Sequence, residues 1–130
     1  MATINRFEDL EIWQEVRRLS KAVFLETINS PEFKSDFRFR DQIRAASGSV
    51  IDNIAEGFER NGNMEFRQFL STAKASAGEV RSQIYRAFDY DYIETERFEQ
   101  LVNEYSMLSG KINNFIIYLN KKDFKGTKFQ

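Results

Sequence analysis

The chain has 130 residues, 42% of them hydrophobic and 30% charged, and its 19 basic residues almost balance its 20 acidic ones, so that the formal net charge is −1. This balance is typical of one globular domain and excludes a disordered chain, and the near-zero charge excludes attraction of the whole molecule to nucleic acid or anionic lipid. Neither cysteine nor histidine occurs. Their absence removes the thiolate nucleophile and the commonest general base and metal ligands, so we expect no enzymatic activity, no metal site and no cofactor.

Two amphipathic helices are predicted in the first half of the chain, because apolar residues recur there at intervals of three and four. The first spans residues 8–29 and ends at Asn29-Ser30-Pro31, since the residue before a proline is pushed out of the helical region. A short connection over residues 32–36 leads to the second helix, which spans residues 38–60 and stops at the turn signal Asn61-Gly62.

Two further helices are predicted in the second half. The third spans residues 64–89, with Asn63 as its expected N-cap. The sequence DYDYIET then interrupts the apolar pattern, and the fourth helix spans residues 96–120 before a basic tail at residues 121–130. Four long helices joined by short loops predict an all-α fold, a single antiparallel up-and-down four-helix bundle over residues 1–130.

The third predicted helix carries a second stripe beside its core face, with three cations and no acid. Its members follow at steps of three and four: Arg67, Ser71, Lys74, Gly78, Arg81 and Tyr85. Repeated positive charge of this kind suits phosphate contacts, and Tyr85 is available for stacking. The alternative is a solvated flank whose cations pair with acids on a neighbouring helix or another subunit.

The sequence SVIDNIAEGFER places polar residues and a glycine inside the second predicted helix. Gly57 projects close to the buried face, so we expect its missing side chain to admit a neighbouring helix or Trp13 at close range. Asn53 lies at the border of that face, in a column that we expect to hydrogen-bond to another helix or subunit and set its register. The other members of the column are Gln42, Ser49, Glu56 and Arg60.

Two features suggest contacts beyond the bundle. The tail NKKDFKGTKFQ carries four lysines against one acid, with phenylalanines between them. The tail is suited to binding nucleic acid. Alternatively, its lysines complement the helix dipole and solubilise the helix end. Thirteen phenylalanines, five tyrosines and one tryptophan exceed what a lone four-helix core requires. This excess predicts self-association, with a wide core as the alternative.

Four sequence blocks resemble one protein family in order along nearly the whole chain. They are FEDLEIWQEVRRLSKAVF at 7–24, QIRAASGSVIDNIAEGFER at 42–60, EFRQFLSTAKASAGEV at 65–80 and DYIETERFEQLVNEYSMLSGKI at 91–112. The chain resembles the four-helix bundle proteins related to those encoded by intervening sequences of bacterial large-subunit ribosomal RNA genes, and NIAEGF is the most distinctive piece of that resemblance.

This resemblance implies a bacterial protein that assembles as a ring-like homopentamer of bundles. The family includes the accessory protein of diversity-generating retroelements, a basic pentameric barrel that binds nucleic acid and the reverse transcriptase. In this chain, the residues that match a basic surface are Arg67, Lys74 and Arg81, with Arg40 and Arg44. For most members of the family no biochemical activity is established.

These observations favour a non-enzymatic, homo-oligomeric helical bundle that acts as an interaction module for RNA or a ribonucleoprotein. The alternative is a purely structural or protein-binding oligomer with no role in nucleic-acid binding. The first nine residues contain no apolar segment, and no window approaches the roughly 20 apolar residues that a membrane span requires. We therefore expect a cytoplasmic protein with no membrane partner.

Overall fold

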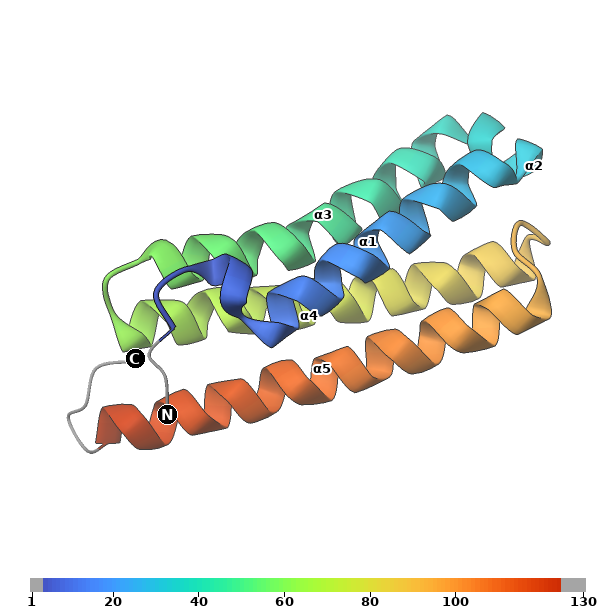
Figure 1. The fold of residues 1–130 in the computed structure, drawn as a ribbon. Helices are drawn as coiled ribbons and strands as arrows, with labels where there is room; N and C mark the ends of the chain where they lie inside the picture. Colours follow the sequence, from blue (N-terminus) through green and yellow to red (C-terminus); the bar gives the residue numbers. More distant parts are fainter. Residues whose placement is uncertain (1–3, 125–130) are drawn as a thin grey trace.

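The computed structural model describes residues 4–124 and confirms the predicted all-α bundle (Figure 1). Four long helices alternate in direction, and no strand occurs among the described residues. In chain order the elements are η1 Phe7–Asp9, α1 Glu11–Asn29, α2 Pro31–Ser35, α3 Phe37–Glu59, α4 Asn63–Asp89 and α5 Thr95–Phe124. None of the described helices combines the length and the apolarity needed to cross a membrane.

The helices form a ring of neighbours, in which α1 packs on α3 and α5, and α4 packs on α3 and α5. Figure 1 shows α1 and α3 side by side above α4 and α5. The core is formed by side chains that project from all four long helices into the space between them. Those with no exposed surface include Val16, Leu19, Val50, Ile54, Leu70, Ala73, Ala77, Val80, Tyr105, Leu108 and Ile112.

The first helix ends at Asn29 as predicted, but its start and the connection that follows it differ from the prediction. Leu10 has an extended backbone, which separates the short η1 from α1, so that the main helix begins at Glu11 rather than at residue 8. The connection expected over residues 32–36 is instead mostly the helix α2. Ser30 caps this helix by accepting a hydrogen bond from the backbone N–H of Phe33, and proline at the first helical position is pre-organised for a helix.

The short helix α2 buries an aromatic side chain at one end of the bundle. The ring of Phe33 is 1% exposed and stacks on Phe39 and Tyr92 at centroid distances of 5.2 and 5.1 Å. The Tyr92 hydroxyl donates a hydrogen bond of 2.9 Å to Asp36, the residue that caps α3. Several of the aromatic residues are therefore used to close this end of the bundle.

In the second half of the chain, the observed helix boundaries lie close to the predicted ones. α4 begins at Asn63, which was expected to be its N-cap; Gly62 holds the cap position and makes no side-chain cap bond. α5 runs to Phe124 and thus includes the first residues of the expected basic tail. Lys125 and Lys128 of that tail lie outside the described residues.

Gly57 lies at a close approach of α4 to α3. A Cβ atom built on Gly57 would be 2.5 Å from the Cβ of Phe69 and 3.0 Å from the ring of Phe66, both on α4. The prediction that Gly57 admits a neighbouring helix is therefore confirmed, and that helix is α4. Trp13 lies elsewhere, half-buried against Phe7 at a centroid distance of 5.1 Å.

We predict that Gly57→Ala lowers the free energy of unfolding by about 1–3 kcal/mol, because the new methyl group overpacks the contact with Phe69. Gly48 is the matched control in the same helix, since a Cβ there meets nothing within 4 Å. Gly48→Ala is expected to raise the free energy of unfolding by up to about 1 kcal/mol through helix propensity. Urea denaturation of both variants measures the difference; a Gly57→Ala variant as stable as Gly48→Ala would contradict this account.

Candidate nucleic-acid interface

The three cations of the predicted stripe face α5 across the groove between α4 and α5. Arg67 donates a hydrogen bond of 2.8 Å to the side-chain oxygen of Asn120. Lys74 donates to Asn113 at 3.4 Å and Arg81 donates to Ser106 at 3.0 Å. We call Arg67, Lys74 and Arg81 the cationic row.

The cationic row and its partners share a seven-residue spacing in opposite directions. The cations are seven residues apart on α4, and Ser106, Asn113 and Asn120 are seven residues apart on α5. Seven residues correspond to about 10.5 Å along a helix. The antiparallel packing of the two helices therefore holds three positive charges in a straight row of about 21 Å.

The partners of Lys74 and Arg81 on α5 are neutral. Among the described residues, no carboxylate lies within 4.0 Å of the cationic group of Lys74 or Arg81. Among the described residues, therefore, neither Lys74 nor Arg81 pairs with an acid on a neighbouring helix, which was the alternative interpretation of the stripe. A neutral amide or hydroxyl oxygen holds the cationic group in position by a hydrogen bond but does not neutralise its charge. The charge therefore stays available to an anion.

The surface between Lys74 and Arg81 is open, and aromatic or apolar side chains lie at both ends of the cationic row. Nothing lies within 4 Å of a Cβ built on Gly78, which is between Lys74 and Arg81. Beyond Arg81, the exposed ring of Tyr85 packs edge-on against Phe98 at 5.1 Å. Beside Arg67, a depression of about 350 Å³ is lined in part by Met64, Ile116 and Ile117.

Arg40 and Arg44 lie on another side of the bundle. Arg44 donates a hydrogen bond of 2.9 Å to Thr27 of α1, and its guanidinium lies 4.6 Å from the centre of the Phe24 ring. Arg40 donates to Asp41 and to the backbone of Lys34. These two arginines face α1 and α2, whereas the cationic row faces α5, so the five basic residues do not form one surface.

Asn53 and its neighbours connect α3 to α4, but Ser49 makes the interhelical contact. The Asn53 amide donates to the backbone oxygen and hydroxyl of Ser49, at 2.8 and 3.0 Å, and the Ser49 hydroxyl lies 2.8 Å from that of Ser76 on α4. Arg60 forms ion pairs with Glu56 at 3.5 Å and with Glu65 at 3.7 Å. These ion pairs are about half exposed and add little stability.

Comparison with known protein families identifies the family of this chain. A family model described as 23S rRNA-intervening sequence protein matches residues 8–114. The chain belongs to this family. Comparison with curated proteins finds no match.

A solved structure has the same fold as this chain. It is that of a protein of unknown function, described as from the S23 ribosomal protein family, from Bacteroides thetaiotaomicron. The two chains are 18% identical, and the similarity covers 81% of this chain and 97% of that chain with a TM-score of 0.73. At this identity the likeness shows the bundle and carries no information on the site.

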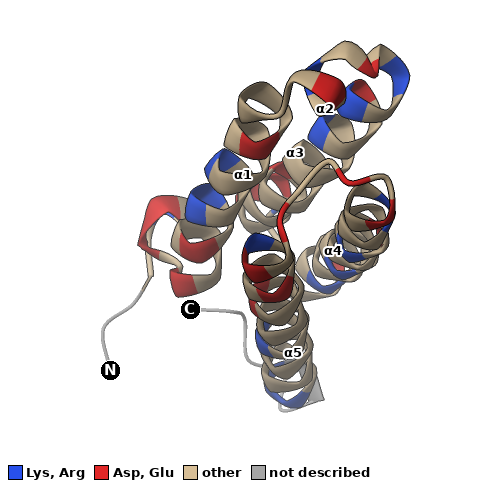
Figure 2. Ribbon diagram, turned by 90° about the vertical axis from the view of Figure 1, so that its right-hand side faces the viewer, with Lys and Arg blue, Asp and Glu red and all other residues tan. Residues whose placement is uncertain are grey.

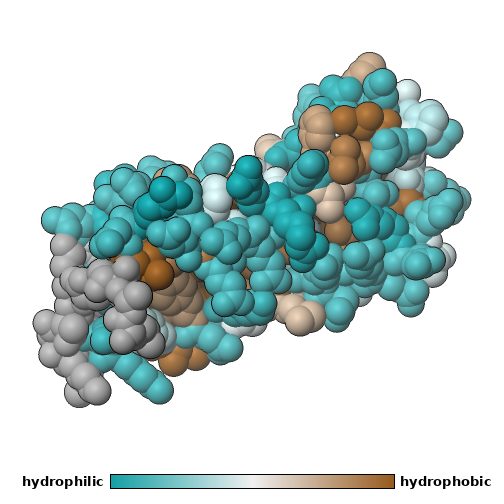
Figure 3. All heavy atoms as spheres, in the orientation of Figure 1, coloured by the Kyte–Doolittle hydropathy of each residue, from teal (hydrophilic) through white to brown (hydrophobic). Residues whose placement is uncertain are grey.

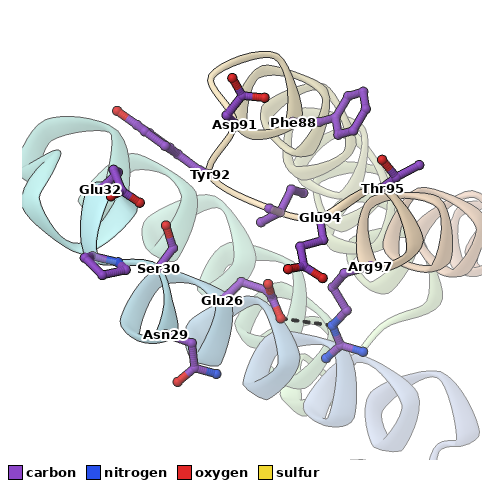
Figure 4. A pocket seen from close by; sticks show the side chains of 12 residues that line it. Glu26, Asn29, Ser30, Glu32, Phe88, Asp91, Tyr92, Glu94, Thr95 and Arg97 are labelled. Atoms are coloured by element: carbon purple, nitrogen blue, oxygen red, sulfur yellow. Dashed lines mark hydrogen bonds and ion pairs between the residues drawn. The ribbon is translucent and has the colours of Figure 1, made fainter.

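A cleft of about 800 Å³ opens between the end of α1 and the loop from α4 to α5. Figure 4 shows the side chains of Glu26, Glu32, Asp91 and Glu94 around it, with Arg97 bound to Glu26 at 3.0 Å. The hydrogen bond to Asp36 raises the pKa of Tyr92, which also lines the cleft. In the described part of the chain, no three side chains of the types that ligate metals are placed to hold an ion.

Charge is thus distributed unevenly over the protein although its net charge is close to zero. Figure 2 shows red segments in the loop before α5 and at the start of α5, and blue segments along α4. A phosphate chain is repelled by the acidic cleft and attracted by the cationic row. Of these two surfaces, the cationic row is the one suited to nucleic acid.

Sequence reasoning missed the residues that orient the cationic row. Asn63 is 7% exposed, donates a hydrogen bond of 2.9 Å to the backbone oxygen of Leu119 and accepts one of 2.8 Å from Arg67. It therefore ties the start of α4 to the end of α5. The seven-residue spacing of Ser106, Asn113 and Asn120 is visible in the sequence, but only the register of α5 on α4 pairs these residues with the cations.

We predict that Asn63→Ala lowers the free energy of unfolding by about 1–3 kcal/mol, because the backbone oxygen of Leu119 loses its buried partner. Asn120 is a matched control, since it also bonds to Arg67 but is exposed. Asn120→Ala is expected to change stability by less than about 0.5 kcal/mol. Urea denaturation gives both values; similar losses in the two variants would contradict the role assigned to Asn63.

Proposed function

We propose that this protein is a non-enzymatic, homo-oligomeric helical bundle that binds RNA or a ribonucleoprotein through the cationic row. The observation that supports the proposal most strongly is that Lys74 and Arg81 are held in a row by neutral partners. A cation bound to a carboxylate must give up that ion pair before it binds phosphate. These cations require no such exchange, and phosphate binding releases counterions from the nucleic acid.

The length of the cationic row and the surfaces at its two ends suit a polynucleotide better than a small anion. A row of about 21 Å has the length to contact several phosphates of one strand. The exposed ring of Tyr85 at one end and the apolar depression beside Arg67 at the other offer surfaces against which unstacked bases pack. The row has no fixed hydrogen-bonding group of the kind that reads base edges, so binding is expected to depend weakly on sequence.

RNA is the nucleic acid that we propose as the partner, because the description of the family names ribosomal RNA. That description connects these proteins with intervening sequences of 23S rRNA. A purely structural or protein-binding oligomer is the competing function, and the experiments below separate the two.

The binding proposal predicts that new carboxylates beside the cations abolish RNA binding while every cation is retained. Asn113→Asp together with Ser106→Asp places acids next to Lys74 and Arg81, and the new ion pairs compete with phosphate. Thr72→Asp with Ser82→Asp is the matched control, because it changes the net charge equally at exposed positions of α4 away from α5. Retention of a short labelled RNA hairpin at low salt is the measurement, and equal binding by both variants overturns the role of the row.

Reversal of all three charges of the cationic row tests the same surface. Arg67→Glu with Lys74→Glu and Arg81→Glu is expected to remove RNA binding and leave the helical circular dichroism spectrum unchanged. If the unaltered protein does not retain RNA at low salt, the proposal fails and the structural or protein-binding function stands.

The oligomeric part of the proposal has its own test. Ten large hydrophobic side chains of the described residues are exposed, which supports self-association. We expect light scattering during gel filtration to give a mass several times that of the 15.3 kDa chain, with a pentamer as the expected state. A mass near 15.3 kDa at the highest soluble concentration would contradict it.

A further inference from the structure

The outward face of α5 is almost free of charge. Every exposed residue from Gln100 to Asn120 is uncharged, and Met107 is 53% exposed in the middle of this stretch. Exposed residues recur along this face at steps of four and three. We call six of them the α5 strip: Asn103, Met107, Gly110, Asn114, Ile117 and Lys121. Depletion of charge around apolar side chains is a feature of protein interfaces.

The outward face of α3 carries a strip with the same spacing. Its six members also follow at steps of four and three, and each is exposed or half-buried. We call them the α3 strip: Asp41, Ala45, Gly48, Asp52, Ala55 and Glu59. The apolar members of this strip are small, whereas the α5 strip contains the larger side chains of Met107 and Ile117.

Each strip has a glycine inside a helix that no contact within the chain requires. A Cβ built on Gly48 or on Gly110 meets nothing within 4 Å. Glycine in a helix is less favourable than alanine, so both residues weaken their helices. Gly57 differs, because its missing side chain admits α4. The close approach of a helix from another molecule would account for Gly48 and Gly110.

The two strips match residue by residue when α3 of one molecule lies parallel to α5 of another. A single offset of 62 residues sets every member of the α3 strip against a member of the α5 strip. Among the apolar residues, the two glycines meet and each alanine meets a large side chain: Gly48 with Gly110, Ala45 with Met107 and Ala55 with Ile117.

The polar members of the strips are complementary in the same register. Both aspartates of the α3 strip lie against asparagines, whose amide N–H groups donate to carboxylates, and a glutamate lies against a lysine. These pairs are Asp41 with Asn103, Asp52 with Asn114 and Glu59 with Lys121. No position of the register sets two charges of the same sign against each other.

This register keeps neighbouring bundles in one orientation. Both α3 and α5 pack against α4 and run antiparallel to it, and they lie diagonally across the bundle (Figure 1). They therefore run in the same direction, and their outward faces lie on opposite sides of the bundle. A parallel contact between α3 of one copy and α5 of the next leaves both bundles pointing the same way.

The register also joins points of α3 and α5 that have similar heights in the bundle. Within one chain, Ser49 of α3 contacts Ser76 of α4, and Lys74, two residues before Ser76, contacts Asn113 of α5. Ser49 is therefore level with about residue 111, which is the same offset of 62 to within about one helical turn. A neighbouring copy is thus displaced sideways, with little shift along the bundle. Two different faces that meet in this way close into a ring when the rotation between copies permits it.

We infer that the α3 strip of one molecule docks on the α5 strip of a second copy, in parallel and at the offset of 62 residues. This inference rests on the proposed self-association and specifies its interface.

An apolar ridge on α1 is the competing surface. Phe24, Leu25 and Ile28 are 44%, 39% and 37% exposed, and Figure 3 shows a brown area over the C-terminal half of α1. The ridge occupies only two helical turns and includes no glycine, so it matches neither strip in length or spacing. Leu25→Glu with Ile28→Glu is expected to leave assembly unchanged, and dissociation of this variant alone would assign the contact to α1 instead.

Substitutions of like residues inside and outside the strips test the interface by sedimentation velocity. Gly48→Leu and Gly110→Leu are each expected to weaken assembly about tenfold or more, because leucine blocks the close approach. Gly78→Leu is the matched control, since its Cβ position is also open but belongs to neither strip. Likewise, Met107→Glu is expected to weaken assembly about tenfold or more, whereas Met64→Glu, at a methionine that is 61% exposed, is not.

Disulfide cross-linking tests the register, because the chain has no cysteine of its own. Asp52→Cys with Asn114→Cys places two thiols against each other only between copies, and oxidation is expected to give a ladder of covalent oligomers on a denaturing gel. Glu59→Cys with Asn103→Cys is the matched control, since these positions meet only if the strips dock antiparallel. A ladder from this control pair and none from the first would overturn the parallel arrangement.

Exchange of charge tests the end of the contact. Glu59→Lys and Lys121→Glu are each expected to weaken assembly about threefold at low salt, and the chain with both substitutions is expected to assemble like the unaltered protein. This rescue would show that neither substitution acts by unfolding the chain. An unaltered protein that is monomeric overturns the proposed self-association. An oligomer that responds to none of the changes in the strips and forms no disulfide between positions 52 and 114 overturns only the interface inferred here.

Discussion

The antiparallel packing of α5 on α4 is the constraint on which the surface chemistry of this protein depends. Its register is held by buried apolar residues along both helices and by Asn63, which bonds to the backbone of Leu119. A shift of α5 by one turn would separate each cation of the row from its neutral partner. The same register turns one side of α5 towards the cations and leaves its charge-free side open.

Much of the fold could be predicted from the sequence because it follows from local rules. The apolar spacing of three and four gives the long helices, and Asn29-Ser30-Pro31 and Asn61-Gly62 interrupt them. The short helix α2 was missed because Ser30 and Pro31 both end one helix and start the next. Asn63 was misjudged because its side chain bonds to α5, a contact with no local signal.

The candidate site could be predicted only in part. The stripe of Arg67, Lys74 and Arg81 is visible as a helical spacing, but its partners depend on which helix lies beside α4. Gly57 was correctly assigned to a close approach, since a glycine on a buried helix face has few other uses. Arg40 and Arg44 were grouped with the stripe on charge alone, and the fold separates them because they face α1 and α2.

A near-zero net charge and a binding surface for anions are compatible here because the acids and the bases occupy different places. Carboxylates gather in the cleft at one end, and the cationic row lies along the side of the bundle, between α4 and α5.

The central claim is that the cationic row binds the phosphate backbone, and the dependence of RNA affinity on salt tests it most directly. Three phosphate contacts with single-stranded RNA predict a slope of about −2 in a plot of log association constant against log salt concentration, steeper if several subunits bind one RNA. A slope near zero, or no binding at the lowest salt concentration, would contradict the account.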